Sequence, residues 1–178
     1  MTGNLQSPSM KHYDVVVIGG AIMGASVAWY LTENPNFNGN ILVVERDLTY
    51  AQCSTGHTNS CIRQQFSTEL NIKISQYAAD FIKNIRCYMG GDARVPKLDI
   101  QNFGYMYLAN TEGSADQLRR NQIVQKNVGA ATQLMSGEAI TRTYPFYNVD
   151  DIILGSINRV DEGYWDGATV FDWWRRQS

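Results

Sequence analysis

The chain has 178 residues, which is enough for a domain with a hydrophobic core of its own. Hydrophobic residues make up 44% and charged residues 18%, and the net charge is −2. Lys and Arg are scattered without a basic stripe, which argues against a nucleic-acid partner. No apolar run approaches the roughly 18 residues that a transmembrane helix needs. Residues 1–10 contain neither Lys nor Arg and resemble no leader sequence, so we expect a cytoplasmic protein without a transmembrane segment.

The cysteine and histidine content bears on metal binding and on redox environment. The chain contains three cysteines, Cys53, Cys61 and Cys87, and two histidines. No two cysteines form a C-x-x-C pair, so we expect no metal site. The odd number of cysteines is typical of a protein in a reducing compartment.

The first 45 residues have the pattern of a strand, a helix and a second strand. Residues 13–18 (YDVVVI) form a β-branched run that predicts a parallel strand buried on both faces. Residues Ile22–Thr32 repeat apolar side chains at helical spacing. A turn-forming stretch at 34–40 precedes a second apolar strand at Ile41–Val44. Together these elements predict a βαβ unit.

A glycine-rich turn lies between the first strand and the helix. It comprises Gly19, Gly20, Ala21, Ile22, Met23 and Gly24. Gly19 permits a tight turn, and Gly24 permits close packing of the helix on the strand. The N-terminus of the helix would then present backbone N–H groups to a pyrophosphate. Ala21 occupies the position of the fingerprint's second glycine, so a methyl group narrows the approach to the phosphates. The alternative is a glycine-rich turn in another kind of α/β protein.

The second strand ends at Glu45, where a dinucleotide-binding domain has an acidic residue. A carboxylate here accepts hydrogen bonds from ribose hydroxyls and repels the 2′-phosphate of NADP. We therefore predict that Glu45 binds the ribose, and we include the neighbouring Arg46 among the cofactor-binding residues.

The rest of the chain alternates helical and extended patterns. Residues 46–66 are polar and irregular, and a strongly amphipathic helix begins at Ser67 or Thr68 and ends before Gly90. The apolar positions of this helix are Leu70, Ile74, Tyr77, Ala78, Phe81, Ile82 and Ile85.

Further elements follow from residue 103 onwards. Strands are predicted at 103–109 and 152–158, and helices at 111–128 and 136–143. A last helix, capped by Asp166, continues to the end of the chain.

Five segments carry a family resemblance. They are YDVVVIGGAIMGASVAWYL at 13–31, VVERD at 43–47, the segment from Ser54 to Ser67 that begins ST and ends IRQQFS, FGYMYLA at 103–109 and DEGYWD at 161–166. They resemble the flavin oxidoreductases that include glycine oxidase, sarcosine oxidase and dimethylglycine dehydrogenase, and in particular the branch of FAD-dependent oxidoreductase domain-containing proteins.

The resemblance implies FAD as cofactor and an α/β fold. We expect a Rossmann-like FAD-binding domain, present in part, with the start of an inserted α+β substrate domain. The expected boundaries are 11–90 and 161–178 for the FAD-binding domain and 91–160 for the substrate domain. Family chains are much longer, so we expect a truncated chain whose last helix exposes an apolar patch.

The resemblance also implies roles for residues after the second strand. Ser54 and Thr55 match the segment beside the FAD phosphates and flavin; the alternative is a simple Ser/Thr loop. Arg63 resembles the arginine that binds the substrate carboxylate; the alternative is a surface ion pair or a structural arginine. His57 resembles the histidine that bonds covalently to flavin in an S-T-x-H sequence; the alternative is a loop histidine.

The implied function is FAD-dependent oxidation of a secondary amine or amino acid, similar to sarcosine or glycine, by hydride transfer to the flavin. One alternative is a flavin-binding assembly or chaperone protein without turnover. Another is an inert truncated fragment. The sequence does not distinguish an oxidase from a dehydrogenase.

Overall fold

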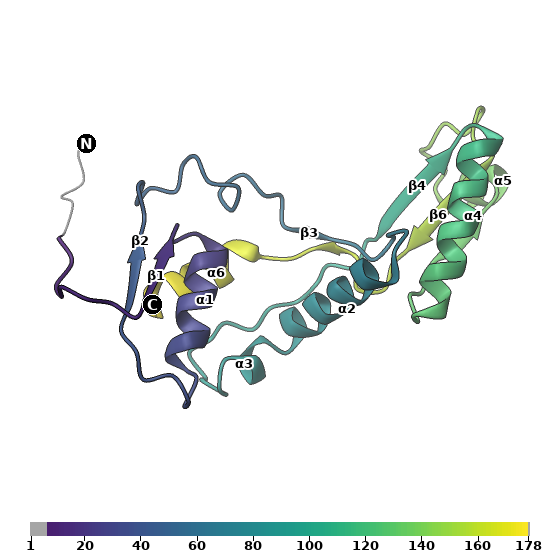
Figure 1. The fold of residues 1–178 in the computed structure, drawn as a ribbon. Coiled ribbons are helices and arrows are strands. Elements are labelled where there is room, and N and C mark those ends of the chain that lie inside the picture. The colour runs from purple at the N-terminus through teal and green to yellow at the C-terminus, as the bar shows by residue number, and fades with distance from the viewer. Residues whose placement is uncertain (1–6, 178) are drawn as a thin grey trace. The chain divides into compact units, whose positions relative to one another are not determined.

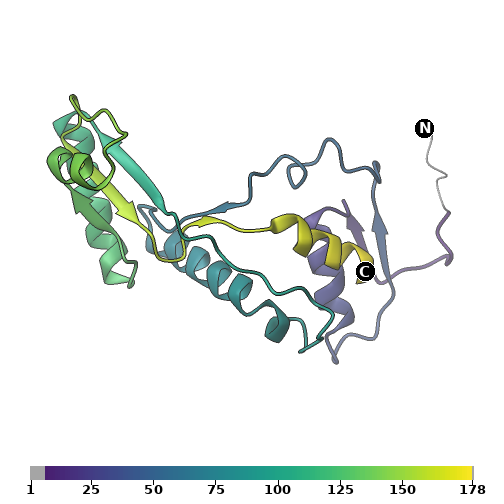
Figure 2. The same ribbon diagram turned by 180° about the vertical axis from the view of Figure 1, so that it is seen from behind.

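The structure is a computed structural model that describes residues 7–177 and divides the chain into two compact units (Figures 1 and 2). Unit 1 combines the residues up to Asn59 with those from Asp166 onwards, and unit 2 comprises Ser60–Trp165. Residues 1–6, which include most of the segment examined for a leader sequence, lie outside the described residues.

Unit 1 contains the predicted βαβ arrangement. Strand β1 (Val15–Ile18) pairs in parallel with β2 (Ile41–Val44), and helix α1 (Ile22–Thr32) connects them. The bounds of α1 and β2 are those predicted from the sequence. This part of the fold follows from local signals, because the glycine turn ends β1 at the point where helical spacing begins.

The predicted burial of β1 on both faces is wrong for the described residues. Val16 and Ile18 are 53% and 88% exposed, whereas Val15 and Val17 are half-buried. Strand β1 pairs only with β2 within residues 7–177, and α1 contacts the two-stranded sheet. The apolar side chains on the opposite face of the sheet therefore have no covering layer in the described part of the chain.

Helix α6 (Gly167–Gln177) belongs to unit 1 and lies beside α1, as both views show (Figures 1 and 2). Asp166 precedes it, as predicted, and its Oδ1 accepts a hydrogen bond from the Thr169 N–H at 3.2 Å. Val170 and Trp174 are buried. The expectation that this helix exposes an apolar patch is therefore wrong for these two side chains, because α6 packs within unit 1.

Unit 2 contains a three-stranded antiparallel sheet. Strand β6 (Leu154–Asn158) lies between β4 (Tyr105–Ala109) and β5 (Gln133–Met135). Helix α4 (Glu112–Asn127) lies on this sheet, and α5 (Gly137–Thr143) follows β5 (Figure 1). The sequence predicted all of these elements except β5, which is only three residues long.

The long amphipathic helix predicted in this region is interrupted. The structure has α2 (Glu69–Lys83) and a short α3 (Ile85–Tyr88), which are separated at Asn84. The Asn84 side chain donates hydrogen bonds to the main-chain oxygen and Oδ1 of Asp80, at 3.1 and 2.8 Å. This local bonding competes with a continuous helix, as is typical of asparagine.

The face that α2 buries differs from the predicted one. Ile72, Ala79 and Ile82 are buried in α2 and Ile85 is buried in α3, and of these Ile82 and Ile85 were among the predicted apolar positions. Leu70 and Tyr77, which were predicted to face a core, are 69% and 59% exposed. Spacing identified the helix correctly, but it did not decide which of two apolar stripes packs within unit 2.

A short antiparallel pair brings together two segments that are distant in the sequence. Strand β3 (Cys61–Ile62) pairs with β7 (Gly163–Tyr164), and neither strand was predicted because each has only two residues. Gly163 has a φ of +147°, and an added Cβ would lie 1.9 Å from the main-chain oxygen of Gln101. A side chain at this position is therefore excluded by both conformation and space.

The compact units divide the chain at other positions than the predicted domain boundaries at 91 and 161. Helix α2 belongs to unit 2, with contacts to α4, although it was assigned to the FAD-binding domain. Compactness does not say what a segment binds, so the functional assignment of the domains stays a prediction. Within residues 7–177, no helix is both long and apolar enough to cross a bilayer.

Candidate functional site

The glycine turn in unit 1 is held by its own backbone. The Gly19 N–H donates to the main-chain oxygen of Val44 at 2.8 Å, and Gly19 has a φ of +97°. A Cβ added to Gly24 would lie 1.8 Å from the Gly19 main-chain oxygen. Such an approach is impossible for a real Cβ, so only glycine at position 24 allows α1 to begin this close to the turn.

The N-terminus of α1 is suited to an anion. Ala21 is the N-cap residue, has no side chain that could accept from the helix, and no acidic residue occupies the first turn. The first-turn N–H groups, including those of Met23 and Gly24, have no acceptor within the helix. The Ile22 N–H donates to Thr55 Oγ1 over a long 3.4 Å. A phosphate oxygen is a stronger acceptor for these groups, because it carries charge.

Glu45 lies beside the turn. Its Oε2 accepts from the Gly20 N–H at 2.8 Å, and its Oε1 accepts from the Asp47 N–H at 2.9 Å. The Asp47 bond and then the Gly20 bond lower the pKa of Glu45 below its ordinary value of 4.5, so the side chain is ionised at neutral pH. Each carboxylate oxygen can accept a further hydrogen bond, so the group keeps capacity for ribose hydroxyls.

The other predicted cofactor residues lie in the loop 46–59, which is built of consecutive turns. Thr55 approaches the N-terminus of α1, whereas the side chains of Arg46, Ser54 and His57 are exposed. The main-chain N–H of His57 donates to the Ser54 main-chain oxygen at 3.2 Å, which places the two residues in one turn. The structure therefore brings Thr55, Glu45 and the glycine turn together.

Tyr50 is a residue of this loop that the sequence did not single out. It has a φ of 56°, and its ring packs edge-on against Phe171 of α6, with 5.0 Å between centroids. Its hydroxyl oxygen would lie 3.1 Å from a Cβ added to Gly20. Burial raises the pKa of Tyr50, so the hydroxyl stays protonated. No motif marks Tyr50, because its role depends on a helix that is distant in the sequence.

The donor set around the turn fits the diphosphate and ribose of FAD. The N-terminus of α1 offers backbone donors, Glu45 offers carboxylate acceptors of the kind that suit ribose hydroxyls, and Thr55 offers a hydroxyl. A Cβ added to Gly19 would meet no atom within 4 Å, so the space over this part of the turn is open.

Arg63, the predicted carboxylate ligand, lies in unit 2. Its guanidinium carbon lies 5.6 Å from the ring centroid of Phe66 and 5.9 Å from that of Tyr105. The side chain is exposed, and no carboxylate forms an ion pair with it among residues 7–177. The predicted alternative of a surface ion pair is therefore not found in the described chain. A guanidinium supported by two rings keeps its N–H donors available for an anion.

Tyr105 contributes one of the two rings. A hydrogen bond with the Cys61 side chain, followed by burial, raises the pKa of Tyr105 to about 12. The phenol is therefore neutral at physiological pH, and its ring face remains attractive to the Arg63 cation.

A buried carboxylate lies in the same unit. Glu162 is 0% exposed. Its Oε1 accepts from the Gln64 N–H at 2.6 Å and from Asn158 Nδ2 at 3.0 Å, and its Oε2 accepts from Gln65 Nε2 at 3.0 Å. Burial raises the pKa of Glu162, whereas these hydrogen bonds and then the charge of Arg63 oppose the rise. The carboxylate therefore has three donors and a nearby cation.

No local pattern in the sequence marks this cluster as a site, although its residues belong to segments that carry the family resemblance. Gln64 and Gln65 belong to IRQQFS and Glu162 belongs to DEGYWD, two segments that carry the family resemblance. Nothing local indicated that these segments meet, because almost a hundred residues separate them along the chain.

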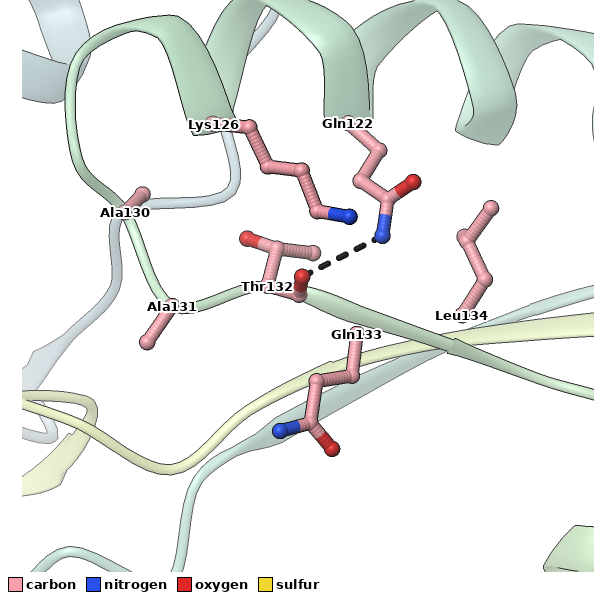
Figure 3. A pocket seen from close by; sticks show the side chains of 7 residues that line it. All are labelled: Gln122, Lys126, Ala130, Ala131, Thr132, Gln133 and Leu134. Atoms are coloured by element: carbon pink, nitrogen blue, oxygen red, sulfur yellow. Dashed lines mark hydrogen bonds between the residues drawn. The ribbon is translucent and has the colours of Figure 1, made fainter.

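A groove of about 620 Å³ opens between α4 and β5 in unit 2 (Figure 3). The Gln122 side chain crosses it and donates from Nε2 to the main-chain oxygen of Thr132 at 3.2 Å. The lining residues are Gln122, Lys126, Ala130, Ala131, Thr132, Gln133 and Leu134. No predicted site residue lines this groove, so it is separate from the candidate sites described above.

Comparisons with known proteins agree with this geometry. Residues 14–177 match the family described as FAD dependent oxidoreductase. The chain is 37% identical over 169 residues to FAD-dependent oxidoreductase domain-containing protein 1 of Xenopus laevis, and the match covers 93% of this chain and 34% of that protein. It is 23% identical to the 4-methylaminobutanoate oxidase (formaldehyde-forming) of Paenarthrobacter nicotinovorans, over 92% of this chain and 19% of that protein.

Among solved structures, the L-proline dehydrogenase of P. horikoshii matches with a TM-score of 0.71 and 25% identity. That match covers 92% of this chain and 41% of the dehydrogenase. The match to the Xenopus relative shows that the chain spans about a third of the length of that protein. The family match over residues 14–177, together with the βαβ unit and its glycine turn, shows that the chain belongs to the FAD-dependent oxidoreductase family and that its cofactor is FAD.

Proposed function

We propose that the protein oxidises the C–N bond of a secondary amine or amino acid that carries a carboxylate. The observation that carries this proposal is Arg63, an exposed guanidinium held over two aromatic rings that forms no ion pair in the described chain. Two of the proteins it resembles are named for L-proline and for 4-methylaminobutanoate, and both compounds combine a secondary amine with a carboxylate.

The proposed roles follow from the chemistry of each group. The N-terminus of α1 binds the pyrophosphate, and Glu45 accepts from the ribose. Arg63 binds the substrate carboxylate through two parallel N–H donors. When bound, FAD accepts a hydride, and thus two electrons, from the carbon of the C–N bond. The proton on the amine nitrogen passes to solvent, and the product is an imine.

His57 is a candidate for covalent attachment of the flavin. It follows Ser54 and Thr55 in an S-T-x-H sequence, and Thr55 contacts the N-terminus of α1. An imidazole attacks through a ring nitrogen that carries no proton, and a neutral histidine has one such nitrogen. The alternative remains a histidine that only belongs to the loop.

The proposal is tested by anaerobic reduction of the FAD-loaded protein. The FAD-loaded protein is mixed with sarcosine, glycine, L-proline or 4-methylaminobutanoate, and the loss of visible flavin absorbance is followed. The absence of oxygen makes the result independent of the natural electron acceptor. We expect at least one of these compounds to bleach the flavin, and Arg63→Ala to weaken its binding by about 10- to 100-fold, as is typical of a lost charged hydrogen bond.

Arg120→Ala is the matched control, because Arg120 is exposed on α4 and its Nη2 donates only to Gln117 Oε1. This variant should behave as the wild type. Bound FAD that none of the amines reduces would favour a flavin-binding assembly or chaperone protein. A purified chain without any flavin absorbance after incubation with FAD would favour an inert fragment.

A further inference from the structure

We infer that Glu162 is a positioning residue that holds Arg63 in place to bind the substrate carboxylate. This inference rests on the proposed function for the role of Arg63. It concerns a different residue, whose hydrogen bonds within residues 7–177 go to Gln64, Gln65 and Asn158 and not to the guanidinium of Arg63.

Glu162 holds the main chain next to Arg63. Glu162 Oε1 lies 2.6 Å from the main-chain nitrogen of Gln64, the residue that directly follows Arg63. The same oxygen accepts from Asn158 Nδ2 at 3.0 Å, and Asn158 ends strand β6. Glu162 therefore connects the peptide after Arg63 to the three-stranded sheet.

Glu162 also helps to hold the strand that carries Tyr105, whose ring lies under the guanidinium. Glu162 Oε2 accepts from Gln65 Nε2, which also donates to the main-chain oxygen of Tyr105 at 2.9 Å. Gln65 Oε1 in turn accepts from Ser156 Oγ at 2.8 Å. The network thus fixes both the main chain beside Arg63 and the strand that carries Tyr105, one of its two supporting rings.

The network requires a carboxylate at position 162. Three N–H donors point at the two oxygens of Glu162, and a carboxylate accepts all three. A glutamine of the same shape would turn one acceptor into a donor and place two donors face to face. A buried charge is also a poor means of stabilising a core, because its desolvation offsets most of its attraction to partners. Its value here lies in fixing one arrangement of the segment 63–66.

The experiment compares Glu162→Gln with Arg63→Ala and with the double variant in the FAD-loaded protein. Flavin reduction is measured for sarcosine, L-proline and 4-methylaminobutanoate, and for dimethylamine, which lacks a carboxylate. We expect Glu162→Gln to weaken binding of the carboxylate-bearing amines by about 10- to 100-fold, as a displacement of about 1 Å can do. The limiting rate at saturation and the response to dimethylamine should change little.

The double variant separates positioning from a general structural role. If Glu162 acts through Arg63, the double variant should bind no more weakly than Arg63→Ala alone. Independent, multiplying losses would overturn the inference. Glu138→Gln, which changes an exposed glutamate on α5, is the matched control and should leave binding unchanged. Unchanged binding in Arg63→Ala would instead refute the proposed role of Arg63.

A crystal structure of the FAD-loaded Glu162→Gln protein tests the inference without any substrate. We expect the guanidinium of Arg63 to leave its position over Phe66 and Tyr105. Retention of both ring contacts would overturn the inference. If Glu162→Gln does not fold, Asn158→Ala, which removes one of the three donors, should displace Arg63 in the same way to a smaller extent, and an unmoved Arg63 in that variant would also overturn it.

Discussion

Replacement of Gly24 by alanine tests whether the turn binds FAD as its geometry indicates. The added Cβ would lie 1.8 Å from the Gly19 main-chain oxygen, 3.0 Å from the Gly19 carbonyl carbon and 3.1 Å from Val17 Cγ1. The oxygen belongs to the backbone and would have to retreat to at least 3.0 Å, the shortest distance that real Cβ atoms show. The turn and the start of α1 must therefore separate.

The cost can be estimated from the size of this displacement. Forcing an extra carbon into a packed position costs about 1–3 kcal/mol. A shift of about 1 Å at a binding group can lower its effectiveness by about 100-fold. We therefore expect Gly24→Ala to weaken FAD binding by about 10- to 100-fold, because the N–H donors of the first turn move away from the pyrophosphate.

The assay is a titration of FAD into the purified protein, followed by the change in flavin fluorescence, with circular dichroism as a check of folding. Gly113→Ala is the matched control, because Gly113 lies in the first turn of α4 and an added Cβ meets no atom within 4 Å. That variant should bind FAD normally and gain up to about 1 kcal/mol of stability from helix propensity. A folded Gly24→Ala protein that binds FAD within about twofold of the wild type would refute the reasoning.

The other predictions concern three side chains, Glu45, Glu162 and His57. Glu45→Gln should weaken FAD binding modestly and Glu45→Arg strongly, and equal affinity in all three proteins would contradict the ribose role. Since hydrogen bonds lower the pKa of Glu45, its contribution to stability should be present above pH 4.5 and lost as the pH falls further, which urea denaturation of wild type and Glu45→Gln across this range would show. Glu162 should behave oppositely, because burial raises its pKa. Its contribution to the free energy of unfolding should be complete below pH 4.5 and should decline as the pH rises from there. A wild-type urea midpoint that follows pH in the same way as that of Glu162→Gln would contradict this. If His57 bonds to the flavin, acid precipitation should leave flavin in the pellet of the wild type and release it from His57→Ala, whereas complete release from both would exclude the bond.

The elements of unit 1 were predictable because their signals are local. One strand–helix–strand unit contains the glycine turn and ends next to Glu45. The bounds of α1 and β2 are those predicted. The approach of Thr55 to the N-terminus of α1 agrees with what the family resemblance implied, and no local pattern indicated it. The packing of Tyr50 on Phe171 was not predictable, because the two residues are more than a hundred positions apart in the sequence.

In unit 2 the sequence located most elements but not their contacts. It predicted β4, α4, α5 and β6, yet missed the short strands, because two or three residues carry no measurable period. It also selected the wrong face of α2, since Leu70 and Tyr77 are exposed while Ile72 is buried. A periodic stripe shows that a helix has an apolar side, but only its neighbours decide which side is covered.

The sequence by itself indicated the family and the cofactor through five segments that resemble the family, and residues 14–177 match it. It also predicted that the glycine turn binds FAD, because that pattern depends on residue types at fixed spacing around one strand–helix junction. It also singled out Arg63 as a carboxylate ligand. Only the tertiary structure showed that Glu162 and the residues following Arg63 meet in a buried network. The physical reason is that a buried carboxylate is stable only where enough donors converge on it, and these donors come from segments that the fold, rather than the sequence order, brings together.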